Sequence, residues 1–102
     1  MIYHLAGREA WERAQREGEY RGDTLASEGF IHCSNDEQIL RVANRYYRGR
    51  SDLVLLTINE ERVQSKVVYE AAPDGERFPH IYGPLNLDAV TETRSIIPGP
   101  DG

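Results

Sequence analysis

The strongest constraint on the fold is a continuous apolar segment, Leu-Val-Leu-Leu-Thr-Ile, at residues 53–58. Asp52 and Asn59 bound it on either side. An apolar run of this length predicts a central strand that is buried on both faces. The chain has 102 residues, of which 39% are hydrophobic, and this is enough for one modest core. We therefore expect one domain over residues 1–97, followed by a disordered tail at 98–102.

Two helices are expected early in the chain, and mostly strands follow. Apolar residues at helical spacing predict them at 8–17 and 36–47. Further strands are expected at 1–6, 29–34, 66–71 and 90–97. We interpret 20–28 as a loop, 73–75 as a turn, 78–85 as a loop or short strand, and 86–90 as one helical turn. The pattern predicts a small α+β fold.

The balance of charges limits the partners that such a chain can have. Twelve Lys and Arg residues against seventeen Asp and Glu residues give a net charge of −5, which argues against nonspecific nucleic-acid binding. Cys33 is the only cysteine, so an internal disulfide is excluded and a reducing compartment is favoured. No apolar run reaches the ~20 residues of a membrane span, and we find no signal-peptide pattern. We expect a cytoplasmic protein with no membrane partner.

Three histidines, His4, His32 and His80, lie in or beside expected strands. Each has an aromatic residue close in sequence. If the strands are neighbours, the three imidazoles converge on one cleft. Three imidazoles and a water suit zinc, but no two of these histidines have the short spacing common in metal sites. Hydrogen-bonded structural histidines are the plainer interpretation, and we assign no metal ligands.

Ser34 and Glu70 each have two interpretations. Alternation places the Ser34 hydroxyl on the same strand face as His32, which suits ligand binding. Ser34 also has capping-box spacing to Glu37, which suits the start of a helix. Glu70 ends an expected strand and is either a general base or transition-state stabiliser, or an ion-paired surface glutamate.

The segment 78–85 and a run of arginines are further candidates. Two prolines and a glycine stiffen the segment, which displays His80 and Tyr82. This suits a ligand site, although a rigid connector with Tyr82 packed on the core is equally consistent. Arg41, Arg45 and Arg48 share one helix face. Such a face either is solvated or contacts a phosphate.

Four segments together resemble a known family: Tyr3-His4, 28–34 (Glu-Gly-Phe-Ile-His-Cys-Ser), 42–45 (Val-Ala-Asn-Arg) and 78–85. On these segments the chain is identified as a member of the bacterial family called domain of unknown function 952, over roughly residues 2–90. That family is remotely similar to the ADP-ribosyltransferases, and especially to the RNA 2′-phosphotransferases. The resemblance implies a split, mostly antiparallel sheet with a cleft that holds NAD.

The resemblance also implies site residues. The segment 3–6 is similar to the first motif of those enzymes, with Leu5 in place of a glycine, and 30–34 is similar to the second. The third motif falls near His80 to Tyr82, with Glu70 as the nearest acid. Glu28 stands roughly where the phosphotransferases have an arginine, which argues against a phosphorylated RNA end as substrate.

We therefore expect a cleft for NAD or a related nucleotide, with ADP-ribosyl transfer or NAD glycohydrolysis as its chemistry. The expected catalytic residues are His32, Glu70 and His80. The expected cofactor-binding residues are His4, Leu5, Ser34, Arg45 and Tyr82. A non-catalytic module that binds a nucleotide or another small molecule is one alternative, and a metal site formed by the three histidines is another.

Overall fold

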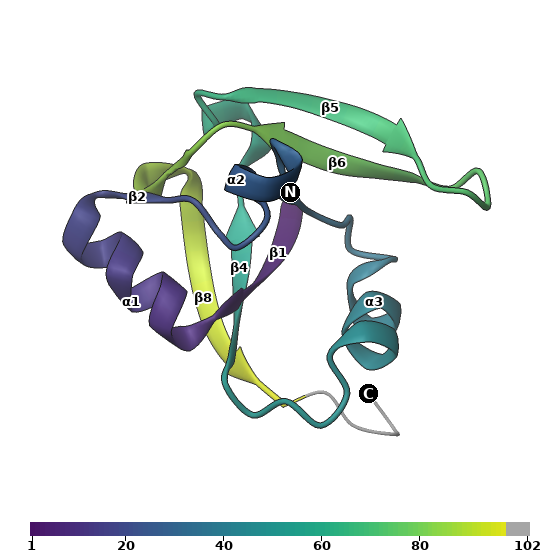
Figure 1. Cartoon of the computed structure of the whole chain (residues 1–102), viewed down its shortest axis with the longest axis horizontal. Helices are drawn as coiled ribbons and strands as arrows, with labels where there is room; N and C mark the ends of the chain where they lie inside the picture. The colour runs from purple at the N-terminus through teal and green to yellow at the C-terminus, as the bar shows by residue number, and fades with distance from the viewer. Residues whose placement is uncertain (98–102) are drawn as a thin grey trace.

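The computed structural model describes residues 1–97, and the tail expected at 98–102 lies outside them. The elements are β1 (Ile2–Gly7), α1 (Arg8–Glu17), β2 (Glu19–Tyr20), α2 (Leu25–Glu28), β3 (Ile31–His32), α3 (Ile39–Tyr46), β4 (Leu53–Ile58), η1 (Glu60–Arg62), β5 (Lys66–Ala71), β6 (Arg77–Tyr82), β7 (Leu85–Asn86), η2 (Leu87–Ala89) and β8 (Val90–Ile96). All strand pairs are antiparallel, in three sheets ordered β1-β4-β8, β2-β7 and β3-β6-β5 (Figure 1). The α+β prediction is confirmed.

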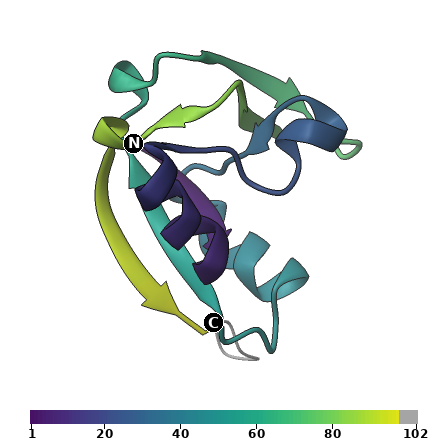
Figure 2. The ribbon, with the colours of Figure 1, turned by 60° about the vertical axis from the view of Figure 1, so that its left-hand side comes forward.

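The predicted central strand is β4, which lies between β1 and β8. Its side chains alternate between two clusters of apolar residues. Val54, Leu56 and Ile58 face the main core, which also receives α1. Leu55 faces a smaller cluster that is formed with α3. The two long helices therefore cover opposite faces of the β1-β4-β8 sheet (Figures 1 and 2).

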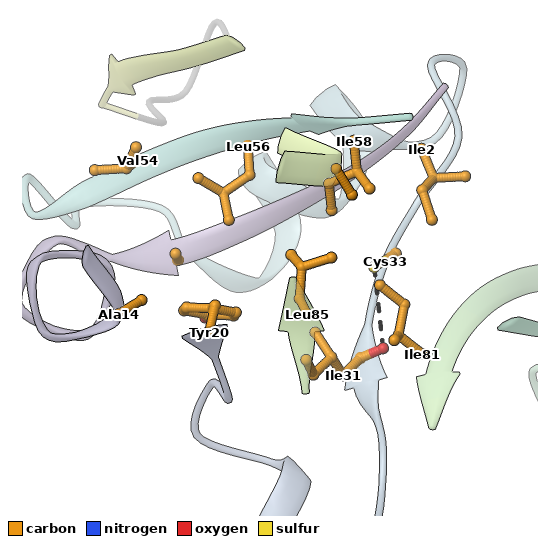
Figure 3. Packing of buried hydrophobic residues seen from close by; sticks show 12 residues of the cluster. Ile2, Ala14, Tyr20, Ile31, Cys33, Val54, Leu56, Ile58, Ile81 and Leu85 are labelled. Atoms are coloured by element: carbon orange, nitrogen blue, oxygen red, sulfur yellow. Dashed lines mark hydrogen bonds between the residues drawn. The ribbon is translucent and has the colours of Figure 1, made fainter. Parts of the chain in front are cut away.

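The main core fills the space between this sheet and the other two sheets. Ile31 and Ile81 enter it from β3 and β6, and Tyr20 and Leu85 enter it from β2 and β7 (Figure 3). All four side chains are at most 2% exposed. Burial of each large apolar side chain contributes about 2 kcal/mol, so this core is what holds the three sheets together.

Two short elements correct the prediction of a loop at 20–28. Tyr20 pairs with Leu85 in the β2-β7 ladder, and 25–28 forms α2. Gly29 ends α2 in the left-handed conformation, with φ of 88°. This backbone conformation is easy for glycine alone, and it turns the chain directly into β3.

The segment 78–85, expected as a loop or short strand, contributes to two strands. Most of β6 lies in it, including Pro79, and β7 begins at its end. The Pro79 carbonyl accepts a hydrogen bond from the Cys33 N–H at 3.0 Å. By continuation of the register, Cys33 lies opposite Pro79, and the proline has no N–H to donate back to it. The regular β3-β6 ladder therefore ends at the His32–His80 pair, and one hydrogen bond from Cys33 extends the pairing by one residue.

The start of α3 differs from the predicted Ser34–Glu37 capping box by one residue. The Asn35 side chain accepts from the N–H groups of Glu37 and Gln38, both at 2.9 Å. The Gln38 side chain accepts in return from the Asn35 N–H at 2.9 Å. Ser34 instead exchanges two backbone hydrogen bonds with Tyr3. Within the described residues, no helix is long and apolar enough to cross a membrane.

Candidate functional site

The candidate site lies on the outer face of the β3-β6-β5 sheet. Ile31 and Ile81 point into the core, so the alternating residues of both strands point outward. The register places His32 directly opposite His80. On the other side of β6 it places Glu70 opposite Phe78, two positions from His80. Of the three histidines expected to converge, His32 and His80 lie together on this face, with ring centroids 5.2 Å apart.

Glu70 is the centre of a small hydrogen-bonded group. Its Oε1 accepts from His80 Nδ1 at 2.6 Å and also from the Tyr82 hydroxyl. These two donors, Tyr82 first, hold the pKa of Glu70 below its ordinary value. The same contact raises the pKa of Tyr82. Glu70 is therefore ionised at neutral pH, and Tyr82 keeps its proton.

Phe30 organises the rings around this group. It stacks on His80 with a centroid distance of 4.2 Å and an angle of 16° between the planes. The centroid of its ring also lies 4.7 Å from that of His32 and 5.2 Å from that of Tyr82. His32 Nε2 in turn donates to Glu28 at 3.2 Å. Each outward histidine thus has its own carboxylate partner.

A pocket of about 600 Å³ extends from this face toward α3. Its wall includes Ser34, Val42, Tyr47, Glu70, Phe78 and His80. A depression of about 230 Å³ adjoins it, shares Val42 and Phe78 with it, and carries Arg45. Gln38 and Arg41 bond to Glu76 at 3.0 and 2.5 Å, which links the α3 segment to the β5-β6 hairpin beside this depression.

His4 is not part of the wall of this pocket and lines a separate small cavity. Its Nδ1 donates to the carbonyl oxygen of His32, which fixes the tautomer, and its Nε2 accepts from the Tyr20 hydroxyl at 2.7 Å. Burial lowers the pKa of His4 to about 4, so the ring is neutral. With both nitrogens bonded, His4 joins β1 to β2 and β3, each of which belongs to a different sheet.

The other expected residues are distributed as follows. Leu5 is buried against Ile39 and Ala43 of α3, and it lines only a small cavity beside His4. Ser34 lines both the small cavity and the main pocket. Arg45 lies over the ring of Tyr46 at 5.3 Å, at the edge of the depression.

The three histidines do not meet as one metal site. Among residues 1–97, no three His, Cys, Asp or Glu side chains are placed to hold one metal ion. Strand alternation places Cys33 on the opposite face from His32, and the structure agrees, since Cys33 is 3% exposed and lies in the core. Burial raises the pKa of its thiol, which makes it a poor nucleophile.

Sequence reasoning did not assign Phe30, Tyr47 or Glu28 to the site. Glu28 precedes His32 by four residues, but the intervening Gly29 turn was needed to bring them together. Phe30 alternates with His32, so its face was predictable, but its stacking on His80 depends on a strand 50 residues away. Tyr47 enters the pocket wall because α3 packs across it.

The sequence matches a family model over residues 5–93, described as "Protein of unknown function (DUF952)". The chain belongs to the DUF952 family. The crystal structure of CC0527 from Caulobacter crescentus is similar, with a TM-score of 0.88, 34% identity, and coverage of 99% of this chain and 90% of that one. A double mutant of CC0527 gives the same values.

The solution structure of the same protein has a TM-score of 0.83 at 35% identity and covers 99% of this chain and 88% of that one. No curated protein matches significantly. Membership in DUF952 confirms the predicted family. The more remote similarity to ADP-ribosyltransferases stays a prediction.

Proposed function

We propose that the pocket binds NAD or a related nucleotide and that the site cleaves or transfers at the ribosyl carbon. The observation that carries this proposal is the Glu70 carboxylate in the pocket wall. Only its Oε1 is used by His80 and Tyr82. Within the described chain, Oε2 has no hydrogen-bond partner and is left for a ligand.

An ionised carboxylate suits this reaction because the transition state is like an oxocarbenium ion. Positive charge develops on the ribose ring as the glycosidic bond breaks, and a fixed negative charge lowers that barrier. The two donors on Oε1 keep Glu70 ionised and hold it in place before substrate arrives. This preorganisation is what makes such a charge effective.

The dimensions and chemistry of the pocket suit a nucleotide. A volume of about 600 Å³ is within the usual range for small-molecule sites. Phe78 and the His32 ring offer flat surfaces for a base or a nicotinamide ring. Arg45, in the adjoining depression, offers a cation for the phosphates.

A non-catalytic binding module is the second candidate, and the position of His4 favours it. His4 belongs to the segment that is similar to the first ADP-ribosyltransferase motif, yet both of its ring nitrogens are bonded inside the protein. A ribose contact at His4 requires one of these bonds to break. The pocket then binds a ligand through the β3-β6-β5 sheet without the full catalytic set.

The deciding experiment is titration with NAD, followed by an assay of nicotinamide release. Ring signals of His32 and His80 are expected to shift together in NMR spectra, and nicotinamide is expected to accumulate. Glu70→Gln keeps the size of the side chain and removes its charge, so it should bind NAD and release far less nicotinamide. Glu92→Gln on β8 changes an exposed glutamate outside the pocket and serves as the control.

Shifts without release, in wild type, would select the binding module. No shift at millimolar NAD would exclude the nucleotide proposal in both of its forms.

A further inference from the structure

We infer that His80 is the proton acceptor of this site, held by Glu70 in the tautomer that leaves Nε2 without a proton. This deepens the proposed function, because it assigns the group that activates the nucleophile. Glu70 then has two separate tasks, with Oε1 orienting His80 and Oε2 facing the ligand.

The tautomer follows from the partner of His80. An ionised carboxylate only accepts hydrogen bonds, so Nδ1 must be the donor in the 2.6 Å contact with Glu70. The neutral imidazole carries one proton, which is therefore on Nδ1. Nε2 has a free lone pair and is the basic nitrogen.

Nε2 is also without a partner in the described chain, on a residue that lines the pocket. His80 makes no hydrogen bond through Nε2 to any of the described residues. In that part of the chain, the one buried side-chain nitrogen or oxygen without a partner is Asn44 Oδ1. Nε2 is therefore accessible to solvent, although the His80 side chain as a whole is 14% exposed. A water or a substrate hydroxyl is the partner that it lacks.

The ring is held in this orientation by stacking and by the strand register. Phe30 stacks on one face of the imidazole at 4.2 Å, and the strand register fixes its backbone between β3 and β5. His32, by contrast, donates through Nε2 to Glu28, so it has the opposite tautomer. The two neighbouring histidines therefore present different nitrogens, and only His80 presents Nε2 as a base.

The charged and titratable groups around His80 come from three strands. Glu70 on β5 is ionised and in direct contact, and it accepts the Nδ1 proton. Tyr82 on β6 donates to the same carboxylate and stays neutral. His32 on β3 is the opposing group, and Glu28 beyond it supplies a second negative charge.

In the hydrolytic reaction, a water oxygen forms a bond to the ribosyl carbon as the carbon–nitrogen bond to nicotinamide breaks. The electron pair of that bond leaves with nicotinamide, which departs neutral. The proton of the water passes to His80 Nε2 and is later released to solvent. An acceptor hydroxyl takes the place of water in a transfer reaction, with the same proton balance.

The first test does not depend on NAD. Nitrogen-15 NMR of the imidazoles in mildly alkaline solution should show the proton on Nδ1 in His80 and on Nε2 in His32. Diethyl pyrocarbonate acylates unprotonated, accessible imidazole nitrogens, and mass mapping should find His80 modified. His4 is the internal control, because both of its nitrogens are bonded and buried. A proton on Nε2 of neutral His80, or no acylation of His80, would overturn the inference.

The second test separates a proton acceptor from a structural residue. Azide attacks the ribosyl carbon without losing a proton, so it needs no base. His80→Gln should slow hydrolysis of NAD by about 100-fold or more. Added azide should restore nicotinamide release in the variant and form the azido sugar. Loss of both reactions would contradict the role of His80 as a base.

If wild-type protein releases no nicotinamide, the proposed reaction fails. The tautomer and acylation results then still decide whether His80 is the basic group.

Discussion

The buried histidine predicts how the protein responds to acid. His4 is 9% exposed, and burial lowers its pKa to about 4 from an ordinary value of 6.5. Below pH 6.5, His4 therefore takes up a proton in the unfolded chain, whereas it stays neutral in the folded protein. Stability is fully present above this value and falls with pH until the folded protein is also protonated, near pH 4.

The size of the effect follows from the gap between the two pKa values. Each pKa unit corresponds to about 1.4 kcal/mol, so the full loss is about 3 kcal/mol. Between pH 7 and pH 5, the expected loss from His4 alone is about 2 kcal/mol. This is a large share of the ~5–15 kcal/mol that stabilises a typical domain.

The assay is urea unfolding of wild type and His4→Gln at several pH values between 7 and 5. The variant should be less stable at pH 7, because the contacts with Tyr20 and the His32 carbonyl change. Its stability should nevertheless depend less on pH than that of wild type, by about 2 kcal/mol over this interval. His32 and His80 remain in both proteins, so the difference in slope reports His4.

Direct titration gives a second readout that does not require the variant to be stable. The carbon-bound ring proton of His4 should titrate with a midpoint near pH 4. A midpoint near 6.5, or equal slopes for the two proteins, would refute the assignment of His4 as a neutral buried ring.

Three further substitutions test the packing, each by urea unfolding. Tyr20→Phe leaves Nε2 of buried His4 without its donor and should cost about 1–3 kcal/mol, so a cost below 0.5 kcal/mol would count against that bond. Leu56→Ala opens a cavity at a fully buried site in β4 and should cost about 2–5 kcal/mol; an unchanged midpoint would contradict its central place in the core. Gln38→Ala removes the 2.8 Å bond to the Arg77 carbonyl and should cost about 1–3 kcal/mol of the free energy of unfolding. An unchanged free energy of unfolding would contradict a structural role for this bond.

Local sequence patterns predicted the elements whose stability is decided locally. The helix at 8–17 and the strands at 53–58 and 66–71 begin and end as predicted. Their apolar spacing marks both the type and the buried face of each element. The strand expected at 29–34 shortens to β3, although its alternation correctly placed Ile31 and Cys33 in the core.

Elements that depend on distant partners were not predictable in the same way. Strand β2 has two residues and exists because Tyr20 pairs with Leu85, which follows it by 65 positions. Strand β6 contains a proline, and it forms because it pairs with β5 over its whole length, while its ladder with β3 ends beside the proline. No local signal in either segment reports the partner.

The candidate site shows the same division. The strand face that carries His32 was predicted by alternation, and its meeting with His80 was predicted on the condition that the two strands are neighbours. The register satisfies that condition. His4 was expected in the same cleft, but alternation assigns a face of a strand and not the sheet to which the strand belongs. His4 lies in the β1-β4-β8 sheet and contacts only the backbone carbonyl of His32 by hydrogen bond.

This contact connects the stability of the fold to the geometry of the site. The His32 carbonyl is held by His4, while its side chain contacts His80 and Phe30 on the outer face. The β1-β4-β8 sheet therefore positions the His32 carbonyl, while the His32 ring lies on the outer face of the β3-β6-β5 sheet. Because Tyr20 of the second sheet donates to the same His4 ring, all three sheets meet at this imidazole. We therefore expect a change at His4 to move the His32 backbone, which would make His4 a positioning residue for the proposed site of His80 and Glu70.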